Sequence, residues 1–340
     1  MVHVTKSEVL VNSSARLHMG FFDLHGGLGR KFGSIGLALT APSVELSAVA
    51  ADKLNVIGVA SERALAITTQ LISKLQLSGS VNLHIQQHIP EHAGLGSGTQ
   101  LALAIGVAIN KIYNLNLSTE KIAELTGRGG RSGIGIAAFN HGGLLIDGGR
   151  SSGMKSVSSR KVHSPKEILN VPPLLARYNF PEHWRILLIF DTTQPGIHGE
   201  DELAAFSQLP VFSESLAAHL CRHVLMQAMP ALVEQDLSAF GRSIQELQAH
   251  VGDYFAPAQG GRYASKQVSA VLQHLENIGI ACFGQSSWGP TGFAVFESAG
   301  AAEQHLQQLK LKFTNDALTW MICEARNHGA DVTLLNDKQL

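Results

Sequence analysis

The stretch PEHAGLGSGTQ, residues 90–100, leads directly into an apolar segment. It carries three glycines at alternate positions, Gly94, Gly96 and Gly98. Because glycine takes positive φ angles without strain, such a backbone can turn several N–H groups toward one anion. Ser97 and Thr99 add hydroxyl donors. The stretch predicts a phosphate-binding loop, and a strand-to-helix turn without a ligand is the alternative.

Regular elements are predicted on both sides of this glycine loop (residues 94–99). The pattern VNLHIQQHI, residues 81–89, alternates apolar and polar side chains as a half-buried strand does. Residues 99–113 repeat apolar side chains at helical spacing, so the positive end of a helix dipole would face the loop. The loop is not a P-loop, which needs a lysine after its last glycine, nor GxGxxG, whose third glycine would fall at Leu101.

Composition limits the classes of function. The chain has 340 residues, of which 45% are hydrophobic and 16% charged, enough for two hydrophobic cores. Its formal net charge of −1 gives no electrostatic reason to expect nucleic acid or a membrane surface as a partner. An anionic substrate must therefore be bound by local groups.

The cysteines and the amino terminus indicate a cytoplasmic protein. The chain has an odd number of cysteines, and they are widely spaced: Cys221, Cys282 and Cys323. This pattern indicates reduced thiols rather than a disulfide framework or a zinc site. The amino terminus lacks the basic and apolar regions of a secretion signal. No run approaches the roughly 20 apolar residues of a membrane-spanning helix.

A buried strand, WRILLIF at residues 184–190, opens the second of two predicted domains, 1–180 and 181–340. The first carries predicted strands at 9–17, 44–49, 81–89 and 144–147 and helices at 99–113 and after Ser118. The second carries helices at 213–229, 231–251, 264–278 and 301–311 and strands at 280–283, 292–296 and 318–323. This order predicts an α+β fold.

The longer stretch PEHAGLGSGTQLALAIG resembles the second motif of the GHMP kinase superfamily, a proline followed by GLGSS and a helix. Gly98 and Thr99 differ, because the family usually has serine and alanine there. Several of these kinases place a catalytic aspartate in a stretch resembling SGxD, where RSGIGIA has Gly135. The resemblance implies a two-domain GHMP kinase-like α+β fold, with a ribosomal protein S5 domain 2-like amino-terminal domain and a ferredoxin-like α/β carboxyl-terminal domain.

Three further segments are similar to one non-kinase branch: ARLHMGFFDLHGGLGRKFGSIGLAL (15–39), GRGGRSGIGIAAFNHGGLLIDGG (127–149) and FGQSSWGPTGFAVF (283–296). They resemble the beta-ribofuranosylaminobenzene 5'-phosphate synthases. The resemblance implies that phosphoribosyl pyrophosphate condenses with 4-aminobenzoate or 4-hydroxybenzoate to a C-riboside 5'-phosphate, releasing carbon dioxide and pyrophosphate, in tetrahydromethanopterin biosynthesis. An ATP-dependent GHMP-type small-molecule kinase and a non-catalytic ligand-binding protein of the same fold are the alternatives.

Basic groups near the glycines are candidate phosphate or carboxylate ligands. Two of them, Arg128 and Arg131, lie in GRGGRSG, where glycines let guanidinium groups approach an anion closely. Ser132 in the same segment is a further candidate ligand. Solvated loop arginines are the alternative. Arg16 and His18 have the spacing that projects side chains to one side of a strand, and a structural role at the strand end is their alternative.

The segment QSSWGP is a candidate substrate-binding turn with amide, hydroxyl and indole groups, from Gln285, Ser286, Ser287 and Trp288. An aromatic acid could stack on the indole while the serines bond its carboxylate or the 5'-phosphate. A core residue that anchors the turn is the alternative for Trp288. We select as catalytic candidates Asp23, Arg131, Ser286 and Ser287.

Mg²⁺ is the expected cofactor, because pyrophosphate must be held, and no organic cofactor is expected since no redox step is required. Candidate ligands are carboxylates in glycine-flanked loops: Asp23, Asp147, Glu200, Asp201 and Glu202, with Glu200 and Asp201 preferred. A place in the first turn of a helix is the alternative for Glu200 to Glu202. A loop-closing role is the alternative for Asp147. The expected partners are the two small-molecule substrates and a second copy of the chain, as a homodimer.

Two histidine patterns do not predict a metal site. His84 and His88 lie on a predicted strand, where four residues span roughly 13 Å, too far for one ion. His219 and His223 are four residues apart on a predicted helix, yet no third ligand is evident nearby in the sequence.

Overall fold

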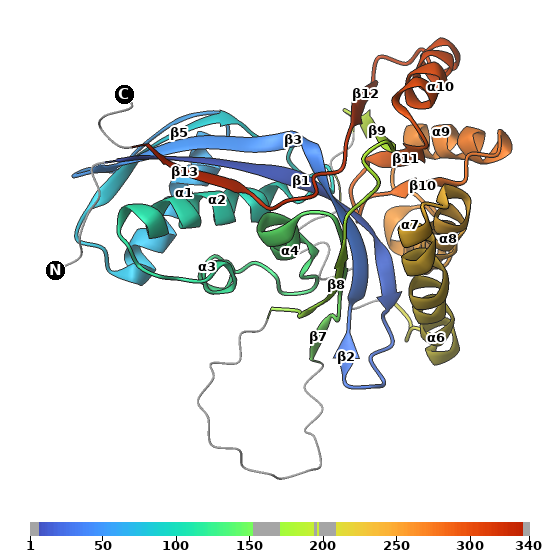
Figure 1. The fold of residues 1–340 in the computed structure, drawn as a ribbon, viewed down its shortest axis with the longest axis horizontal. Coiled ribbons are helices and arrows are strands. Elements are labelled where there is room, and N and C mark those ends of the chain that lie inside the picture. Colours follow the sequence, from blue (N-terminus) through green and yellow to red (C-terminus); the bar gives the residue numbers. More distant parts are fainter. Residues whose placement is uncertain (1–6, 152–170, 194–195, 197–208, 336–340) are drawn as a thin grey trace, which may run out of the picture.

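The computed structural model describes residues 7–151, 171–193, 196 and 209–335, in which two larger β-sheets carry packed helices (Figure 1). The first sheet has seven strands, in the order β13-β1-β3-β5-β4, with β6 beside β3 and β8 beside β6. Its strands are β1 (Glu8–Asp23), β3 (Gly33–Ala51), β4 (Asn55–Gly58), β5 (Ser80–Gln87), β6 (Leu144–Asp147), β8 (Leu174–Tyr178) and β13 (Asp331–Leu335). The short strands β2 (Arg30–Lys31) and β7 (Arg150–Ser151) pair separately.

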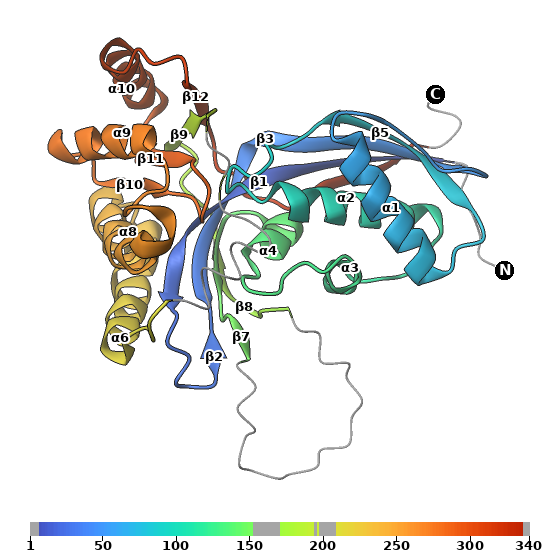
Figure 2. The ribbon, with the colours of Figure 1, turned by 180° about the vertical axis from the view of Figure 1, so that it is seen from behind.

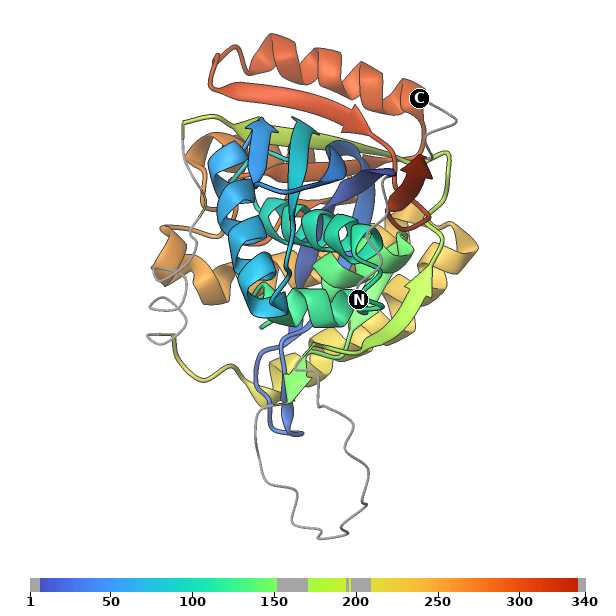
Figure 3. The ribbon, with the colours of Figure 1, turned by 90° about the vertical axis from the view of Figure 1, so that its left-hand side faces the viewer.

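The helices of the first half lie on one face of this sheet (Figure 1 and Figure 3). They are α1 (Ser61–Leu75), α2 (Ser97–Ile112), α3 (Thr119–Leu125) and α4 (Ile134–His141). The alternation in β5 explains this packing, since Val81 and Leu83 are buried while His84 is exposed. Helix α2 lies deepest, and Gly106 lets α3 approach it, because a Cβ there would collide with Ile122.

The second half combines a four-stranded antiparallel sheet with helices beside it (Figure 2). The sheet order is β10-β11-β9-β12, from β9 (Arg185–Asp191), β10 (Cys282–Gln285), β11 (Gly292–Phe296) and β12 (Leu318–Cys323). The helices are α6 (Glu214–His223), the π-helix η1 (Val224–Ala228), α7 (Met229–Glu234), α8 (Leu237–Gln259), α9 (Lys266–Asn277) and α10 (Ala299–Lys312). Helix α8 packs against both β10 and β1, so it joins the two halves.

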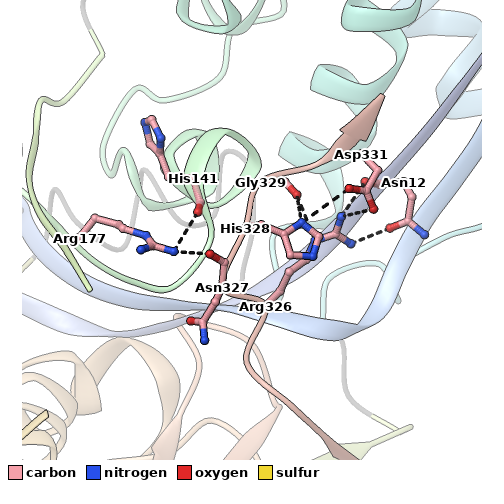
Figure 4. Close-up of polar contacts among 8 residues, drawn as sticks. All are labelled: Asn12, His141, Arg177, Arg326, Asn327, His328, Gly329 and Asp331. Atoms are coloured by element: carbon pink, nitrogen blue, oxygen red, sulfur yellow. Dashed lines mark hydrogen bonds and ion pairs between the residues drawn. The ribbon is translucent and has the colours of Figure 1, made fainter. Parts of the chain in front are cut away.

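The carboxyl end of the chain returns to the first sheet, where β13 pairs with β1 (Figure 4). The buried Arg326 donates to Asn12 Oδ1 (2.8 Å) and forms an ion pair with Asp331 (2.8 Å). Asn327 exchanges two hydrogen bonds with the backbone of Phe180, at 2.8 and 2.9 Å. The boundary at residue 180 stays a prediction, because β9 begins the second sheet after it while β13 crosses back to the first.

The structure confirms the α+β class and three predicted strands at their predicted bounds, β6, β11 and β12. The predicted helix at 231–251 is wrong as a single element, because two helices, α7 and α8, meet within it at Gln235 and Asp236. Gln235 takes a φ of +59° and ends α7, and Asp236 caps α8 by accepting from Ala239 N at 2.9 Å. No helix in the described part of the chain is both long and apolar enough to cross a membrane.

Candidate active site

The glycine loop turns directly into α2 through two residues in the left-handed region. Gly94 has a φ of +77° and Gly96 one of +85°, angles that a residue with a Cβ adopts only with strain. Gly96 caps the helix, so the N–H groups of Ser97 and Gly98 have no acceptor within α2. The loop therefore presents backbone donors and the positive end of the helix dipole to one point.

Three arginines from separate segments converge on this first turn of α2. A Cβ placed on Gly98 would collide with Arg63 Nη2 and would lie 3.1 Å from Arg128 Nη1. A Cβ placed on Gly96 would lie 3.2 Å from Arg16 Cγ. The absent side chains of two glycines therefore make room for guanidinium groups beside the helix N-terminus.

The positive charges of Arg63 and Arg128 are only partly balanced. Arg63 pairs with Glu91 at 2.9 Å. Burial and the nearby charge of Arg63 lower the pKa of Arg128, and its buried Nε has no hydrogen-bond partner among the described residues. A bound anion would offset the repulsion between these guanidiniums and satisfy their donors. The arrangement suits a polyanion such as a pyrophosphate.

The turn QSSWGP fixes the shape of the glycine loop from the other half of the molecule. Ser286 donates through Oγ to Gly94 O at 2.8 Å and accepts from His18 N at 3.0 Å. A Cβ on Gly94 would collide with Ser286 O, and a Cβ on Gly289 would collide with Ala93. The hydroxyl of Ser286 is thus committed to holding the loop, which is a positioning role.

His18, Gln285, Ser287 and Trp288 line a small cavity of about 30 Å³ against α8. Burial, with a contribution from the Arg16 charge, lowers the pKa of His18 to about 3, so its ring is neutral at neutral pH. The Trp288 ring packs on Phe255 with centroids 4.4 Å apart. A cavity of this size holds water rather than a benzoate ring, so the structure shows Trp288 as a packed wall.

Gly135, at the start of α4, lies against the glycine loop. A Cβ there would approach Thr99 Cγ2 to 3.1 Å, and Gln100 Nε2 donates to Gly135 O at 2.8 Å. The position where related kinases carry an acid is therefore adjacent to the first turn of α2, and in this chain it holds no carboxylate.

Asp147 organises the neighbouring glycine segment. It is fully buried and accepts hydrogen bonds from Ser34 Oγ (2.7 Å), Ser132 Oγ (2.9 Å), Gly133 N (2.8 Å) and Gly149 N (2.8 Å). Burial raises the pKa of this carboxyl in spite of these bonds. Asp147 therefore closes the loop before α4, and Ser132 is one of its hydrogen-bond donors.

Of the remaining candidates, Asp23 lies in a separate turn. Asp23 ends β1, where its Oδ1 accepts from His25 N (2.9 Å) and Gly26 N (3.0 Å) in the turn toward β2. It lies five positions along the strand from His18, a span of roughly 15 Å. Arg131 is half-buried in the segment before α4. Glu200 and Asp201, the preferred Mg²⁺ ligands, lie outside the described residues.

Sequence reasoning missed Arg63. It lies in the first turn of α1, in SERALAI, which reads as an ordinary amphipathic helix without glycines or a motif. Only the packing of α1 beside α2 brings its guanidinium to Gly98. The sequence carries no signal for this contact.

A larger cavity of about 600 Å³ adjoins the residues just before the glycine loop. Its walls come from Glu91 to Ala93, the end of β9 and β12, and they include Phe190, Trp320 and Met321. Gly289 and Gly94 contact each other beside it. It is wide enough for an aromatic ring.

Comparisons with known proteins identify the same superfamily that the sequence motifs resemble. Residues 61–143 match the GHMP kinases N terminal domain, and residues 228–315 match GHMP kinases C terminal. The chain is 33% identical over 326 residues to "Beta-ribofuranosylphenol 5'-phosphate synthase" of Archaeoglobus fulgidus, covering 95% of this chain and 98% of that protein. It is 35% identical over 301 residues to the protein of the same name from Methanocaldococcus jannaschii, with 84% and 89% covered. The crystal structure of homoserine kinase from Cytophaga hutchinsonii shares the fold, with a TM-score of 0.65 at 16% identity and 98% and 99% coverage.

Proposed function

Since the chain belongs to the family of beta-ribofuranosylphenol 5'-phosphate synthases and is therefore an enzyme, a pentosyltransferase with the GHMP kinase fold, we propose that its donor is phosphoribosyl pyrophosphate and its acceptor a para-substituted benzoate. The products are a C-riboside 5'-phosphate, carbon dioxide and pyrophosphate. The convergence of Arg16, Arg63 and Arg128 on the first turn of α2 is the observation that carries this proposal.

The glycine loop and the arginines hold the pyrophosphate and stabilise it as it leaves. The ring carbon that bears the carboxylate attacks C1 of the ribose, and the electrons of the C1–O bond depart with pyrophosphate. The carboxylate then leaves as carbon dioxide, and its bonding electrons restore the aromatic ring. Donors fixed before the reaction stabilise the developing charge without reorganisation.

Neither step removes a hydroxyl proton, so the absence of an acid at Gly135 is compatible with this chemistry. The neutral, buried His18 is likewise unsuited to donate a proton at neutral pH, because burial lowers its pKa to about 3. Orientation and charge supply the catalysis. A kinase that phosphorylates an alcohol would lack its base at this position.

We place the aromatic acid in the 600 Å³ cavity beside the loop, because the cavity at Trp288 is too small for a ring. Trp320 offers an aromatic face there. The relatives are named for the phenol product, which favours 4-hydroxybenzoate, and 4-aminobenzoate is the second acceptor. Titration with either acid should quench the fluorescence of Trp320, and Trp320→Phe should remove that quenching.

Mg²⁺ enters this proposal as the counter-ion that pyrophosphate brings with it. Two carboxylates of the described site are already engaged, Glu91 by Arg63 at 2.9 Å and Asp147 by four hydrogen bonds. Glu91 and Asp147 are therefore not free to coordinate the ion at the loop.

A cytoplasmic location and a homodimer complete the proposal. The three cysteines are free, with Cys282 and Cys323 buried, as expected in a reducing compartment. Leu225 and Met226 on η1 are 59% and 67% exposed and offer an apolar surface to a second copy. Light scattering would measure the oligomeric state.

Carboxyl-labelled 4-hydroxybenzoate or 4-aminobenzoate tests the reaction directly. With phosphoribosyl pyrophosphate and Mg²⁺, the purified enzyme should release labelled carbon dioxide, and omission of the donor should abolish the release. Arg128→Lys keeps the charge but loses the planar fork, so kcat/KM should fall by about tenfold or more. Full activity in that variant would place the phosphates elsewhere, and no labelled gas with either acid would overturn the reaction.

A further inference from the structure

Three histidines and a glutamate come together on helices α6 and α8, away from the glycine loop. His219 and His223 lie one turn apart on α6, and Glu246 and His250 lie one turn apart on α8. Potential ligand atoms of His219, His223 and Glu246 all lie within 4.8 Å of one another. Glu246 Oε2 is 3.2 Å from His219 Nε2 and 3.4 Å from His250 Nε2.

We propose that His219, His223 and Glu246 bind a divalent transition metal ion such as Zn²⁺. The pairs at i and i+4 on adjacent helices bring three ligands to one point, because residues four apart share a helix face, and His250 lies beside Glu246. Two imidazoles and a carboxylate are a ligand set that zinc takes in proteins. This ion is distinct from the Mg²⁺ of the proposed reaction, since Mg²⁺ prefers oxygen ligands.

Outer contacts orient one of these imidazoles. His223 Nδ1 lies 3.0 Å from Gln227 Oε1, which also accepts from Ser243 Oγ at 3.0 Å. The bond at Nδ1 fixes the tautomer and leaves Nε2 as the ligand atom, as outer hydrogen bonds do for metal-bound histidines. Ser243 is fully buried on α8, so the support is anchored in the core.

The surroundings favour a metal bound by coordination rather than by charge. A hollow of about 400 Å³ beside the histidines is lined by Arg222 and Met226 as well. The positive charge of Arg222 weakens the binding of hard cations, which are held mainly by electrostatics. Imidazole nitrogen, in contrast, bonds zinc, nickel or copper strongly. His219, Glu246 and His250 are 41 to 45% exposed, so an ion can enter without opening the fold.

The consequence of binding would be a cross-link between the two helices. Helix α6 packs against β1 and α8, and Cys221 Sγ approaches Phe22 O at 3.8 Å near the end of β1. A metal that joins α6 to α8 would hold α6 in place and raise the melting temperature by linkage, because it binds the folded chain and not the unfolded one.

The test is metal titration of the untagged, chelator-treated protein. Zn²⁺ should bind at one ion per chain by calorimetry, and Co²⁺ should give the intense visible absorption of a tetrahedral site. His219→Ala and Glu246→Gln should each weaken binding by about tenfold or more, a loss at least as large as that caused by removing an outer partner of a metal site. His274→Ala, on the separate helix α9, is the control and should bind as the wild type does.

The melting temperature gives an independent readout. Zn²⁺ should raise it in the wild type and in His274→Ala, but not in His223→Gln, whose apo form should melt near the wild type because the side chain is only half-buried. Unchanged affinity in all the ligand variants, or binding equal to that of any exposed histidine, would overturn the site.

Discussion

At the scale of single residues, the site depends on side chains that are absent. Gly98 has no side chain where Arg63 and Arg128 meet, and Gly135 has none where a carboxylate would face Thr99. Both positions leave space beside the first turn of α2, and two guanidinium groups lie beside Gly98. The same two absences let an anion approach the helix and remove the acid that kinase chemistry requires.

Gly98→Ala should weaken binding of phosphoribosyl pyrophosphate by about tenfold or more, since its methyl group displaces Arg63 and Arg128 from the first turn. The folded state should survive, because Gly98 is helical and the displaced atoms are the far ends of flexible side chains. Calorimetric titration measures the affinity and thermal melting the fold. Gly300→Ala, where nothing lies within 4 Å, is the matched control. Wild-type affinity in a folded Gly98→Ala protein would contradict the placement of the phosphates.

The pH dependence of stability should report on His18. Its pKa is about 6.5 in the unfolded chain and about 3 in the folded one, so below pH 6.5 the unfolded state binds the extra proton. The contribution of His18 is complete above pH 6.5 and declines as the pH falls toward 3. Between pH 7 and pH 5 the free energy of unfolding should drop by about 2 kcal/mol more in the wild type than in His18→Gln. Urea unfolding at both pH values measures this, and parallel curves would show that His18 is protonated in the fold.

The sequence identified the glycines but only part of the basic cluster. Gly94, Gly96 and Gly98 can be recognised in the sequence, because a left-handed backbone and the close approach of other atoms both require glycine. Arg63 does not, because its role arises from the packing of α1 on α2. The third metal ligand on α8 was missed for the same reason, since Glu246 follows His223 by more than 20 residues and meets it only after the helices pack.

At the scale of elements, α4 and α2 meet at Gly135. Gly135→Asp should lower synthase activity by about tenfold or more relative to Gly135→Asn, because its carboxylate would compete with the substrate phosphates for the donors of α2 and the arginines. The two side chains have nearly the same size, so their comparison separates charge from crowding at the 3.1 Å contact with Thr99. Steady-state kinetics at saturating acceptor measures both. Equal rates would show that residue 135 lies outside the reacting centre.

Helix α8 joins the halves through Gln248. Its side chain donates to Met19 O (2.6 Å) and Gln285 O (3.0 Å) and accepts from Gln285 N (2.8 Å), all buried. Gln248→Leu should leave three backbone groups unpaired and cost about 3 kcal/mol of unfolding free energy. The same substitution at the exposed Gln273, Gln273→Leu, is the control and should change the free energy of unfolding by less than about 0.5 kcal/mol. Chemical denaturation compares the two, and a small loss in Gln248→Leu would mean that water replaces these bonds.

Local patterns predicted elements well where periodicity is strong. Strands β6, β11 and β12 and helix α2 follow from short apolar runs or helical spacing. Strand β13 was missed, because DVTLL is short and mostly exposed and pairs with β1 at the opposite end of the chain. The break at Gln235 was missed because the apolar period continues across it and no glycine marks the left-handed turn.

At the scale of the whole molecule, the site exists because the two halves close on each other. Ser286 from the second half bonds Gly94 and His18 of the first, and β13 ties the carboxyl end to β1. The fold is shared with kinases, so the arrangement of the site, and not the architecture, has to distinguish transfer of a pentosyl group from transfer of a phosphoryl group.

The most direct test is the stoichiometry of products from one reaction mixture. The enzyme is supplied with phosphoribosyl pyrophosphate, Mg²⁺ and 4-hydroxybenzoate or 4-aminobenzoate, and carbon dioxide, pyrophosphate and C-riboside are measured together. We predict equal amounts of all three, and no ADP when ATP is supplied with homoserine, galactose or mevalonate. Pyrophosphate without carbon dioxide, or ADP formed from ATP with one of these alcohols, would contradict the account.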